Sequence, residues 1–370
     1  MHPDLLYQIA LTFVPNVGDI KAKKLIAYCG SAEAVLKSNK SLLQKIPDIG
    51  EVVSGSIALS QTLQRAEQEL RFVEKNNITA LSYLDDDYPY RLKQCEDSPL
   101  VLYNKGNALL NSKHIISVVG TRSATQYGKQ LCETLMRDFA DLNYHPLIVS
   151  GLAFGIDIAA HKAALKYGLP TAAVLGHGLN MVYPAVHKGV LENMLFAGGS
   201  AISGFASETN MHAANFVNRN RIIAGLADAT IVVESAERGG SLITAQMAVD
   251  YARDVYAFPA RVDDKSSVGC NALIRSNKAG LVTCAADIVY ALGWDVVHKK
   301  KSQLSVFEQV ALSSTEEKIY KLLCEVGAKD IDEICRLSSL PMPEVSSTLL
   351  SLEFNGMVKA LPGKVFSVVK

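Results

Sequence analysis

The chain has 370 residues and should therefore contain two or three domains. Hydrophobic residues make up 49% and charged residues 20% of it, as in globular proteins that have sizeable cores. The formal net charge is zero, which excludes a global electrostatic attraction to nucleic acid or to an anionic membrane. Any such partner has to be held by a local patch of the surface.

The seven cysteines form no Cys-x-x-Cys pair, and their odd number fits reduced, mostly packed thiols. The N-terminus has no basic region followed by an apolar core, and no uninterrupted apolar run reaches about 18 residues. We therefore expect a soluble, cytoplasmic protein that has no membrane partner.

Residues 1–77 are expected to form an all-helical domain of the SAM or helix-hairpin-helix type, because apolar residues recur there at helical spacing. Two turns share an apolar-Pro-x-apolar-Gly pattern, Val14 to Gly18 and Ile46 to Gly50. In helix-hairpin-helix elements such a glycine lets backbone N–H groups approach a DNA phosphate. A second basic or glycine residue is missing from both turns, which favours two tight interhelical turns in a small bundle.

Six short apolar runs in the middle of the chain alternate with helix-like stretches. The runs are residues 115–120, 147–151, 171–176, 201–205, 230–234 and 255–259. They predict parallel strands that are buried on both faces. Right-handed crossovers place the carboxyl ends of such strands at one edge of the sheet, where α/β folds bind ligands. Residues 78–297 are therefore expected to form one α/β domain.

Residues 298–313 begin with a polar, basic run and are expected to form a linker. Residues 314–370 then predict three helices and a hairpin, the order typical of winged-helix domains, which bind DNA through the third helix. The third helix, residues 343–354, contains no Lys or Arg. A contact with protein or a structural role is therefore at least as well supported as DNA binding.

The first predicted strand of the sheet is followed by Gly120-Thr121-Arg122, a glycine turn that leads into a helix. It is not a Walker A loop, because Gln130 stands where Ser or Thr would bind magnesium. An anion site is still plausible at such a turn. Arg122 supports it, because an arginine at the end of a strand in an open cleft has few roles in a core.

The second turn contains Ser150 and Gly151, where a hydroxyl and the following amides can cradle a phosphate. Asp157 and His161 follow it one helical turn apart and could form an acid/base or metal pair. No third ligand accompanies them, so a hydrogen-bonded pair that braces the helix is favoured and no metal site is expected. A third turn, at Gly176, lacks the last glycine of a dinucleotide fingerprint.

The fourth turn contains Arg238, Gly239, Gly240 and Ser241. The backbone amides of the last three would face a phosphate there, with the arginine beside it. The alternative is a tight turn that needs its glycines only for their backbone angles.

A predicted helix start just before the fourth turn combines Phe216 with Asn218, Arg219 and Arg221. Interleaved base-stacking and phosphate-binding groups suit single-stranded nucleic acid. Core packing of Phe216 and internal salt bridges between the arginines and nearby glutamates are the structural alternatives.

Together these residues resemble the DprA/Smf family of DNA-processing proteins over most of residues 80–290. The resemblance rests on the four turns, on the run Arg219 to Leu226 and on Gly269 to Ile274. It implies an extended Rossmann-like fold with helical and winged-helix accessory domains, and a homodimer. It also implies that the protein binds single-stranded DNA, protects it, and loads RecA recombinase onto incoming strands during natural transformation. No catalysis and no cofactor are implied.

Position by position, Arg122 matches the DNA-contacting arginine of the family, Phe216 its stacking aromatic, and the glycine turns its phosphate contacts. The hypothesis is thus a DNA-binding protein rather than an enzyme. Its expected DNA-binding residues are Gly120, Thr121, Arg122, Ser150, Gly151, Phe216, Asn218, Arg219, Arg221, Arg238, Gly239, Gly240 and Ser241.

Two other hypotheses remain open. The first is a nucleotide-binding hydrolase of the phosphoribohydrolase type, but residues 245–247 lack the carboxylate that such enzymes need after the glycine turn. In the second hypothesis the winged-helix tail recognises specific duplex DNA, and the α/β domain binds a small molecule as a sensor. Its weakness is the third helix, which has no basic residues.

Overall fold

The computed structural model describes residues 4–58, 61–294, 313–361 and 364–368. The chain divides into two compact units, Met1–Trp294 and Asp295–Lys370. The expected helical and α/β domains both belong to the first unit. The expected linker, residues 298–313, lies outside the described residues except for its last position. In the part of the chain that the structure describes, no helix has the length and apolar character needed to cross a membrane.

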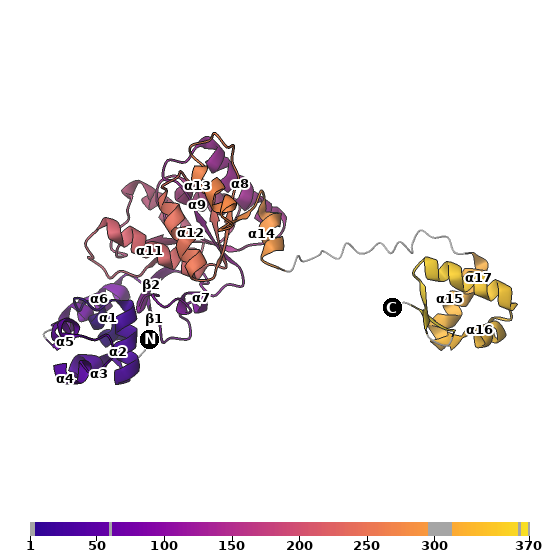
Figure 1. Ribbon diagram of the computed structural model, residues 1–370, viewed down its shortest axis with the longest axis horizontal. Helices are drawn as coiled ribbons and strands as arrows, with labels where there is room; N and C mark the ends of the chain where they lie inside the picture. Colours follow the sequence, from indigo (N-terminus) through magenta and orange to yellow (C-terminus); the bar gives the residue numbers. More distant parts are fainter. Residues whose placement is uncertain (1–3, 59–60, 295–312, 362–363, 369–370) are drawn as a thin grey trace. The chain divides into compact units, whose positions relative to one another are not determined.

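The N-terminal part of the first unit is a helical bundle, as the sequence predicts (Figure 1). Its helices are α1 (Leu5–Thr12), α2 (Asp19–Cys29), α3 (Ala32–Lys37), α4 (Lys40–Leu43), α5 (Glu51–Ala58) and α6 (Leu63–Lys75). Asn16 and Asp48, in the two Pro-containing turns, have φ values of 65° and 64°. The bundle shares its core with Val101 and Tyr103 of the neighbouring sheet, so the helices are packed against the α/β part.

A nine-stranded sheet forms the centre of the first unit, in the order β1-β2-β6-β5-β4-β3-β7-β8-β9. The strands are β1 (Thr79–Ser82), β2 (Val101–Gly106), β3 (Ile115–Val119), β4 (Leu147–Ser150), β5 (Thr171–Leu175), β6 (Ser200–Ser203), β7 (Ala229–Val232), β8 (Asp254–Ala257) and β9 (Gly280–Leu281). The strands from β6 to β9 in this order are parallel, whereas β2 pairs antiparallel with β6 and with β1. The six predicted strands are confirmed as β3 to β8.

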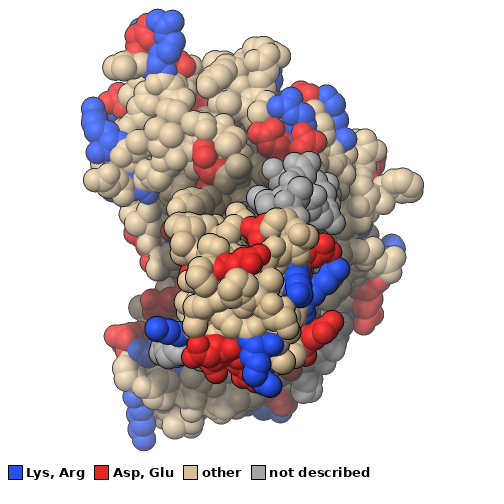
Figure 2. Space-filling view, turned by 90° about the vertical axis from the view of Figure 1, so that its right-hand side faces the viewer, with Lys and Arg blue, Asp and Glu red and all other residues tan. Residues whose placement is uncertain are grey.

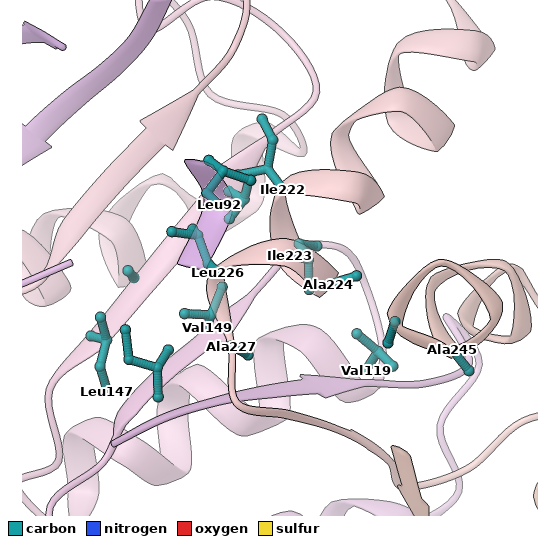
Figure 3. Packing of buried hydrophobic residues seen from close by; sticks show 14 of the residues in the cluster. Leu92, Val119, Leu147, Val149, Ile222, Ile223, Ala224, Leu226, Ala227 and Ala245 are labelled. Carbon is teal, nitrogen blue, oxygen red and sulfur yellow. The ribbon is translucent and has the colours of Figure 1, made fainter. Parts of the chain in front are cut away.

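Helices cover both faces of the sheet. On one face, α8 (Gln126–Asp141), α9 (Ile156–Lys166) and α14 (Ala285–Ala291) share a core with Ile116 and Val118 of β3. On the other face, α11 (Ala213–Leu226), α12 (Gly240–Asp250) and α13 (Val268–Arg275) pack with Val119 and Val149. Figure 3 shows this second core, in which Ile223 and Ala245 approach the sheet from the two helices. Short helices α7 (Tyr90–Lys93), η1 (Ala185–His187) and α10 (Lys188–Phe196) complete the unit.

The order of the strands fixes where a ligand can bind. From β3 the chain first builds the sheet outward through β4, β5 and β6, and then returns to place β7 on the other side of β3. The loops after β3 and β7 therefore diverge and leave a crevice at the carboxyl edge, which is the usual binding position in open α/β sheets. The first and fourth predicted turns lie at this crevice.

The second unit has the three helices and hairpin that the sequence predicts. Its elements are α15 (Ser314–Val326), β10 (Lys329–Asp330), α16 (Ile331–Ser338), α17 (Met342–Phe354), β11 (Val358–Leu361) and β12 (Val365–Val368). Ser313 and Glu316 form a capping box at the start of α15. Helix α17 exposes Leu350 (54%) and Phe354 (84%) rather than basic side chains.

Candidate functional site

A cavity of about 490 Å³ opens at the crevice between the loops after β3 and β7. Its walls come from the loop after β3, the first turns of α11 and the first turn of α12. It brings together eight of the thirteen residues expected from the sequence, namely Gly120, Thr121, Arg122, Phe216, Arg219, Gly239, Gly240 and Ser241. Segments that are about a hundred residues apart in the chain thus form one surface.

Arg122 is exposed and lies where this cavity meets two further hollows. Among the described residues, none forms a hydrogen bond or an ion pair with its guanidinium. The loop that carries it is firmly supported, because Thr121 N donates to the Glu234 carbonyl oxygen at 2.7 Å. A Cβ on Gly155, whose φ is 78°, would overlap the Thr121 carbonyl oxygen. A fixed loop therefore presents an unpaired cation to solvent.

The N-terminus of α12 faces this site, and no described side chain caps its first backbone amides. Gly239 precedes the helix and provides no side-chain cap, and Gly240 is exposed with free space around it. The unpaired amides of a helix start carry partial positive charge and attract anions. Ser241 turns its hydroxyl inward to Ser235 Oγ at 2.9 Å, so its contribution is the backbone. Arg238 is exposed next to this turn but does not line the cavity.

The N-terminus of α8, in contrast, is already occupied by a carboxylate of the protein itself. Glu234 accepts hydrogen bonds from Thr125 N at 2.9 Å and from Thr125 Oγ1 at 2.7 Å. Thr125 in turn caps α8 by accepting from Gly128 N at 3.1 Å. At the first turn, therefore, the helix start is closed, and the side chain of Arg122 is the charged group left free to meet an anion.

The second turn is filled in the same way. Ser150 directs its hydroxyl into the sheet, where it donates to the Val118 carbonyl oxygen at 2.6 Å. The Asp157 carboxylate accepts from Ala153 N at 3.4 Å, so it takes the place that the sequence suggests for a phosphate. Burial raises the pKa of Asp157, although Arg219 opposes the shift. Ser150 and this loop consequently shape the floor beneath the site.

His161 does not pair with Asp157, contrary to the favoured interpretation of these two residues. Its Nδ1 lies 2.7 Å from Thr171 Oγ1, and the side chain is fully buried. Burial lowers the pKa of His161 to about 3, so the ring is neutral near pH 7. Within the described ranges no group of three or more His, Cys, Asp or Glu residues could hold a metal ion.

Arg219 lines the cavity from below and is itself buried. It is 4% exposed, and its Nη1 donates to the Gly151 carbonyl oxygen at 2.6 Å and to the Val174 carbonyl oxygen. Burial lowers its pKa to about 10, and Asp157 opposes that shift. The guanidinium therefore ties α11 to the ends of β4 and β5, and contributes a fixed positive charge below the floor.

Asn218 and Arg221 lie on the other flank of α11. Both line a separate hollow of about 570 Å³ next to the helical bundle. Arg221 Nη2 pairs with Asp19 Oδ2 at 2.6 Å, and its Nη1 donates to the Asp97 carbonyl oxygen at 2.6 Å. The arginine thus has the internal salt bridge that was its structural alternative, although the partner is an aspartate of α2 and not a nearby glutamate.

The sequence reasoning missed two aromatic residues of the site, Phe154 and Tyr183. The rings of Tyr183 and Phe216 lie 5.7 Å apart at 53°, and both side chains border the same small hollow as Phe154 and Arg122. Tyr183 is 46% and Phe154 48% exposed. Each follows a glycine turn at the end of a strand, and that position was the available signal. Three aromatic rings thus line one hollow together with the exposed arginine.

Comparisons with known proteins place this geometry in a family. A family model described as DNA recombination-mediator protein A matches residues 78–293, and one described as DprA winged helix domain matches residues 307–364. Protein Smf of Escherichia coli is 35% identical over 324 residues, which are 82% of this chain and 83% of that protein. DNA processing protein DprA of Streptococcus pneumoniae is 37% identical over 248 residues, 67% of this chain and 86% of that protein.

Two solved structures are similar to parts of this chain. The X-ray structure of the Streptococcus pneumoniae protein has a TM-score of 0.62 and 31% identity, and covers 77% of this chain and 96% of that chain. A structure of DNA processing protein A from Helicobacter pylori, which concerns its single-stranded DNA binding mode, has a TM-score of 0.51 and 28% identity. It covers 58% of this chain and 95% of that chain.

Proposed function

The chain belongs to the DprA/Smf family of DNA-processing proteins, and from this premise we propose that it binds single-stranded DNA in the cavity at the carboxyl edge of its sheet. The observation that carries the proposal is the placement of Arg122. This unpaired, exposed cation lines the same cavity as the half-buried ring of Phe216 and the open N-terminus of α12. One nucleotide of a flexible strand can use all three groups, because its phosphate can bind the cation and the helix start while its base stacks on the ring.

The chemistry of the cavity favours recognition of the backbone and of base faces over recognition of sequence. Arg122 and the amides of Gly240 and Ser241 can contact phosphate oxygens. Phe216 offers a ring to a base, and every base has a face that can stack. A duplex hides those faces, so the site should prefer single strands. Figure 2 shows acidic and basic side chains interspersed on the face in view, so this face carries no continuous basic field.

The structure also refines the set of residues that we propose to contact DNA. Arg122, Phe216, Gly239, Gly240, Ser241 and the backbone of Gly120 and Thr121 remain direct candidates. Ser150, Gly151 and Arg219 are proposed to position the floor, because their polar groups are engaged within the protein. Arg238 is proposed as a peripheral phosphate contact. Asn218 and Arg221 are not proposed to touch a strand in this cavity, because they face the helical bundle.

We further propose that the bound strand is protected and handed to RecA recombinase during natural transformation, by a cytoplasmic homodimer. This part rests on the family resemblance alone. It predicts that the protein lets RecA form filaments on strands that are already covered by a single-strand binding protein. If RecA assembles at the same rate with and without the protein, the loading function is wrong, whatever its affinity for DNA.

The decisive experiment is a titration of the full chain with single-stranded and double-stranded oligonucleotides of one sequence at several salt concentrations. We expect the single strand to bind more tightly than the duplex. We call the slope of log affinity against log salt concentration the salt slope, and each phosphate contact should add about 0.7 to its magnitude. Equal affinity for the duplex would overturn the proposal.

The same preparations test the two other hypotheses. Deleting residues 302–370 should leave the affinity for single strands nearly unchanged, and loss of all DNA binding would favour the winged-helix domain as the reader. Release of free base from nucleoside monophosphates would favour the hydrolase. The structure gives that hydrolase little support, because Asp250, the first acid of α12, is hydrogen bonded to Gln246 at 2.8 Å.

A further inference from the structure

A second hollow of about 370 Å³ lies on the far side of Arg122, between the first turns of α8 and α9. We call it the α8–α9 groove. Its functional lining residues are Arg122, Lys129, Phe154 and Lys162. Lys129 and Lys162 are both exposed, and among the described residues neither has an ion pair. The described residues that line the groove include no Asp or Glu.

The groove continues the cavity rather than forming a separate pocket. Arg122 lines both hollows and also the small hollow between them, where Phe154, Tyr183 and Phe216 border it together. The two hollows lie against opposite helical layers, since α11 and α12 cover one face of the sheet and α8 and α9 the other. A chain that passes Arg122 would therefore cross the carboxyl edge of the sheet from one layer to the other.

Phe154 is placed to act on a ligand in this groove. It is 48% exposed, unlike the aromatic residues of the cores, and it is held from below by His187 at a centroid distance of 5.0 Å. His187 is itself buried and is hydrogen bonded to the Leu152 carbonyl oxygen at 2.8 Å. An exposed ring on a braced support, beside cations, has the chemistry of a base-stacking platform.

From these observations we propose that the α8–α9 groove binds a continuation of the same DNA strand, with Lys129 and Lys162 on its phosphates and Phe154 on a base. The inference rests on the proposed function and extends it. The strand would be longer than the cavity alone can hold, with the aromatic rings in a row and the cations beside them. Arg122 would then lie at the middle of the path and not at its end.

The test compares oligonucleotides of about 6 and about 20 nucleotides on the full chain. In the double variant Lys129→Gln/Lys162→Gln the long strand should bind about 20-fold more weakly at 0.1 M salt, and the salt slope should fall by about 1.4. The short strand, which the cavity can hold, should change less than about twofold. The matched control is Lys37→Gln/Lys188→Gln, which removes the same charge from two exposed lysines outside the groove.

The variant Phe154→Trp gives an independent measurement. The chain has one tryptophan, Trp294, which is 8% exposed in the core on the α8 side of the sheet. A tryptophan at position 154 should be quenched by the long strand, and the wild-type fluorescence should stay constant. Unchanged affinity and slope in the double variant, or an unquenched Phe154→Trp, overturns the inference.

The failure of the inference can be told from the failure of the proposed function. If the wild-type protein binds long single strands and Arg122→Ala weakens that binding, the proposed function stands. The groove is then wrong if its double variant behaves like the control. If the wild-type chain prefers no single strand of either length, the proposed function fails, and the groove fails with it.

Discussion

The guanidinium of Arg219 lies directly against the backbone of Gly151, with Nη1 2.6 Å from the glycine carbonyl oxygen. A Cβ at this position would overlap the guanidinium, and it would lie 2.6 Å from Cζ. Arg219 also reaches the Val174 carbonyl oxygen and the charge of Asp157. The close approach thus joins α11 to the ends of β4 and β5, and a side chain at position 151 would displace the Arg219 guanidinium.

We therefore expect Gly151→Ala to lower the free energy of unfolding of the first unit by about 2–4 kcal/mol, because it displaces a buried guanidinium from its acceptors. Trp294 fluorescence reports this unit during denaturation. The matched control is Gly189→Ala on α10, where a Cβ meets no atom within 4 Å. An alanine in a helix should be neutral or stabilise by up to about 1 kcal/mol. Equal stability of the two variants would contradict the account of Gly151.

Arg122→Ala should reduce the affinity for single-stranded DNA about tenfold, since one charge-assisted phosphate contact is lost. The salt slope should fall by about 0.7. The free energy of unfolding should not change, because the side chain is exposed and bonded to no described residue. Arg71→Ala, on an exposed arginine of α6, is the control. A comparable loss of affinity in that control would mean that Arg122 acts only through net charge.

Phe216→Leu should weaken binding by about 1–3 kcal/mol, the contribution of one stacked base. Leucine keeps an apolar contact with Tyr183 and with Gly176. The Phe216 ring packs closely on this glycine, since a Cβ added there would lie 2.8 Å from the ring. Because stacking releases no counterions, the salt slope should stay as in the wild type. Phe196→Leu, on a side chain that is 96% exposed on α10, should have no effect. A changed slope would show that the ring orders the phosphate contacts instead.

The sequence predicts the sheet well because its strands are continuous apolar runs, which is a local signal. All six predicted strands begin and end within two residues of β3 to β8. The winged-helix order is predicted for the same reason, since caps and periodicity are local. The glycine turns are also found, and Gly239 and Gly240 lie at an open helix start as expected.

What occupies a turn cannot be predicted locally. The amide of Thr125 is bonded to Glu234, which lies 109 residues further along the chain. The loop after Ser150 is closed by Asp157, a residue that the sequence equally allows to face outward. The flank of α11 on which Arg221 lies depends on where the helical bundle packs, and no periodicity inside the helix contains that information. Two of the expected phosphate cradles are therefore internal contacts.

Arg221→Gln should lower the stability of the first unit by about 2 kcal/mol and leave the affinity for single strands within about twofold. The Arg221 and Asp19 side chains are 19% and 22% exposed, so without the arginine Asp19 would keep little solvent and the hydrogen bond from Leu100 N, but would lose its ion pair. Thermal unfolding and the oligonucleotide titration measure the two quantities separately. If Arg221→Gln is as stable as the wild type but binds single-stranded DNA much more weakly, Arg221 contacts DNA after all.

His161 should make the stability of the first unit depend on pH. Burial lowers its pKa from 6.5 to about 3, so between these values the unfolded chain binds more protons than the folded one. The free energy of unfolding should therefore fall as the pH decreases, by up to about 1.4 kcal/mol per pH unit, and by about 2 kcal/mol between pH 6.5 and pH 5.

His161→Asn removes this titration and keeps a polar partner for Thr171. Its stability relative to the wild type should therefore rise by about 2 kcal/mol over the same interval. The control is His145→Asn, which makes the same substitution at an exposed histidine. Denaturant titrations at several pH values, followed by Trp294 fluorescence, give both differences. A constant difference for His161→Asn would show that the ring is charged in the folded protein and that His161 and its surroundings accommodate the charge.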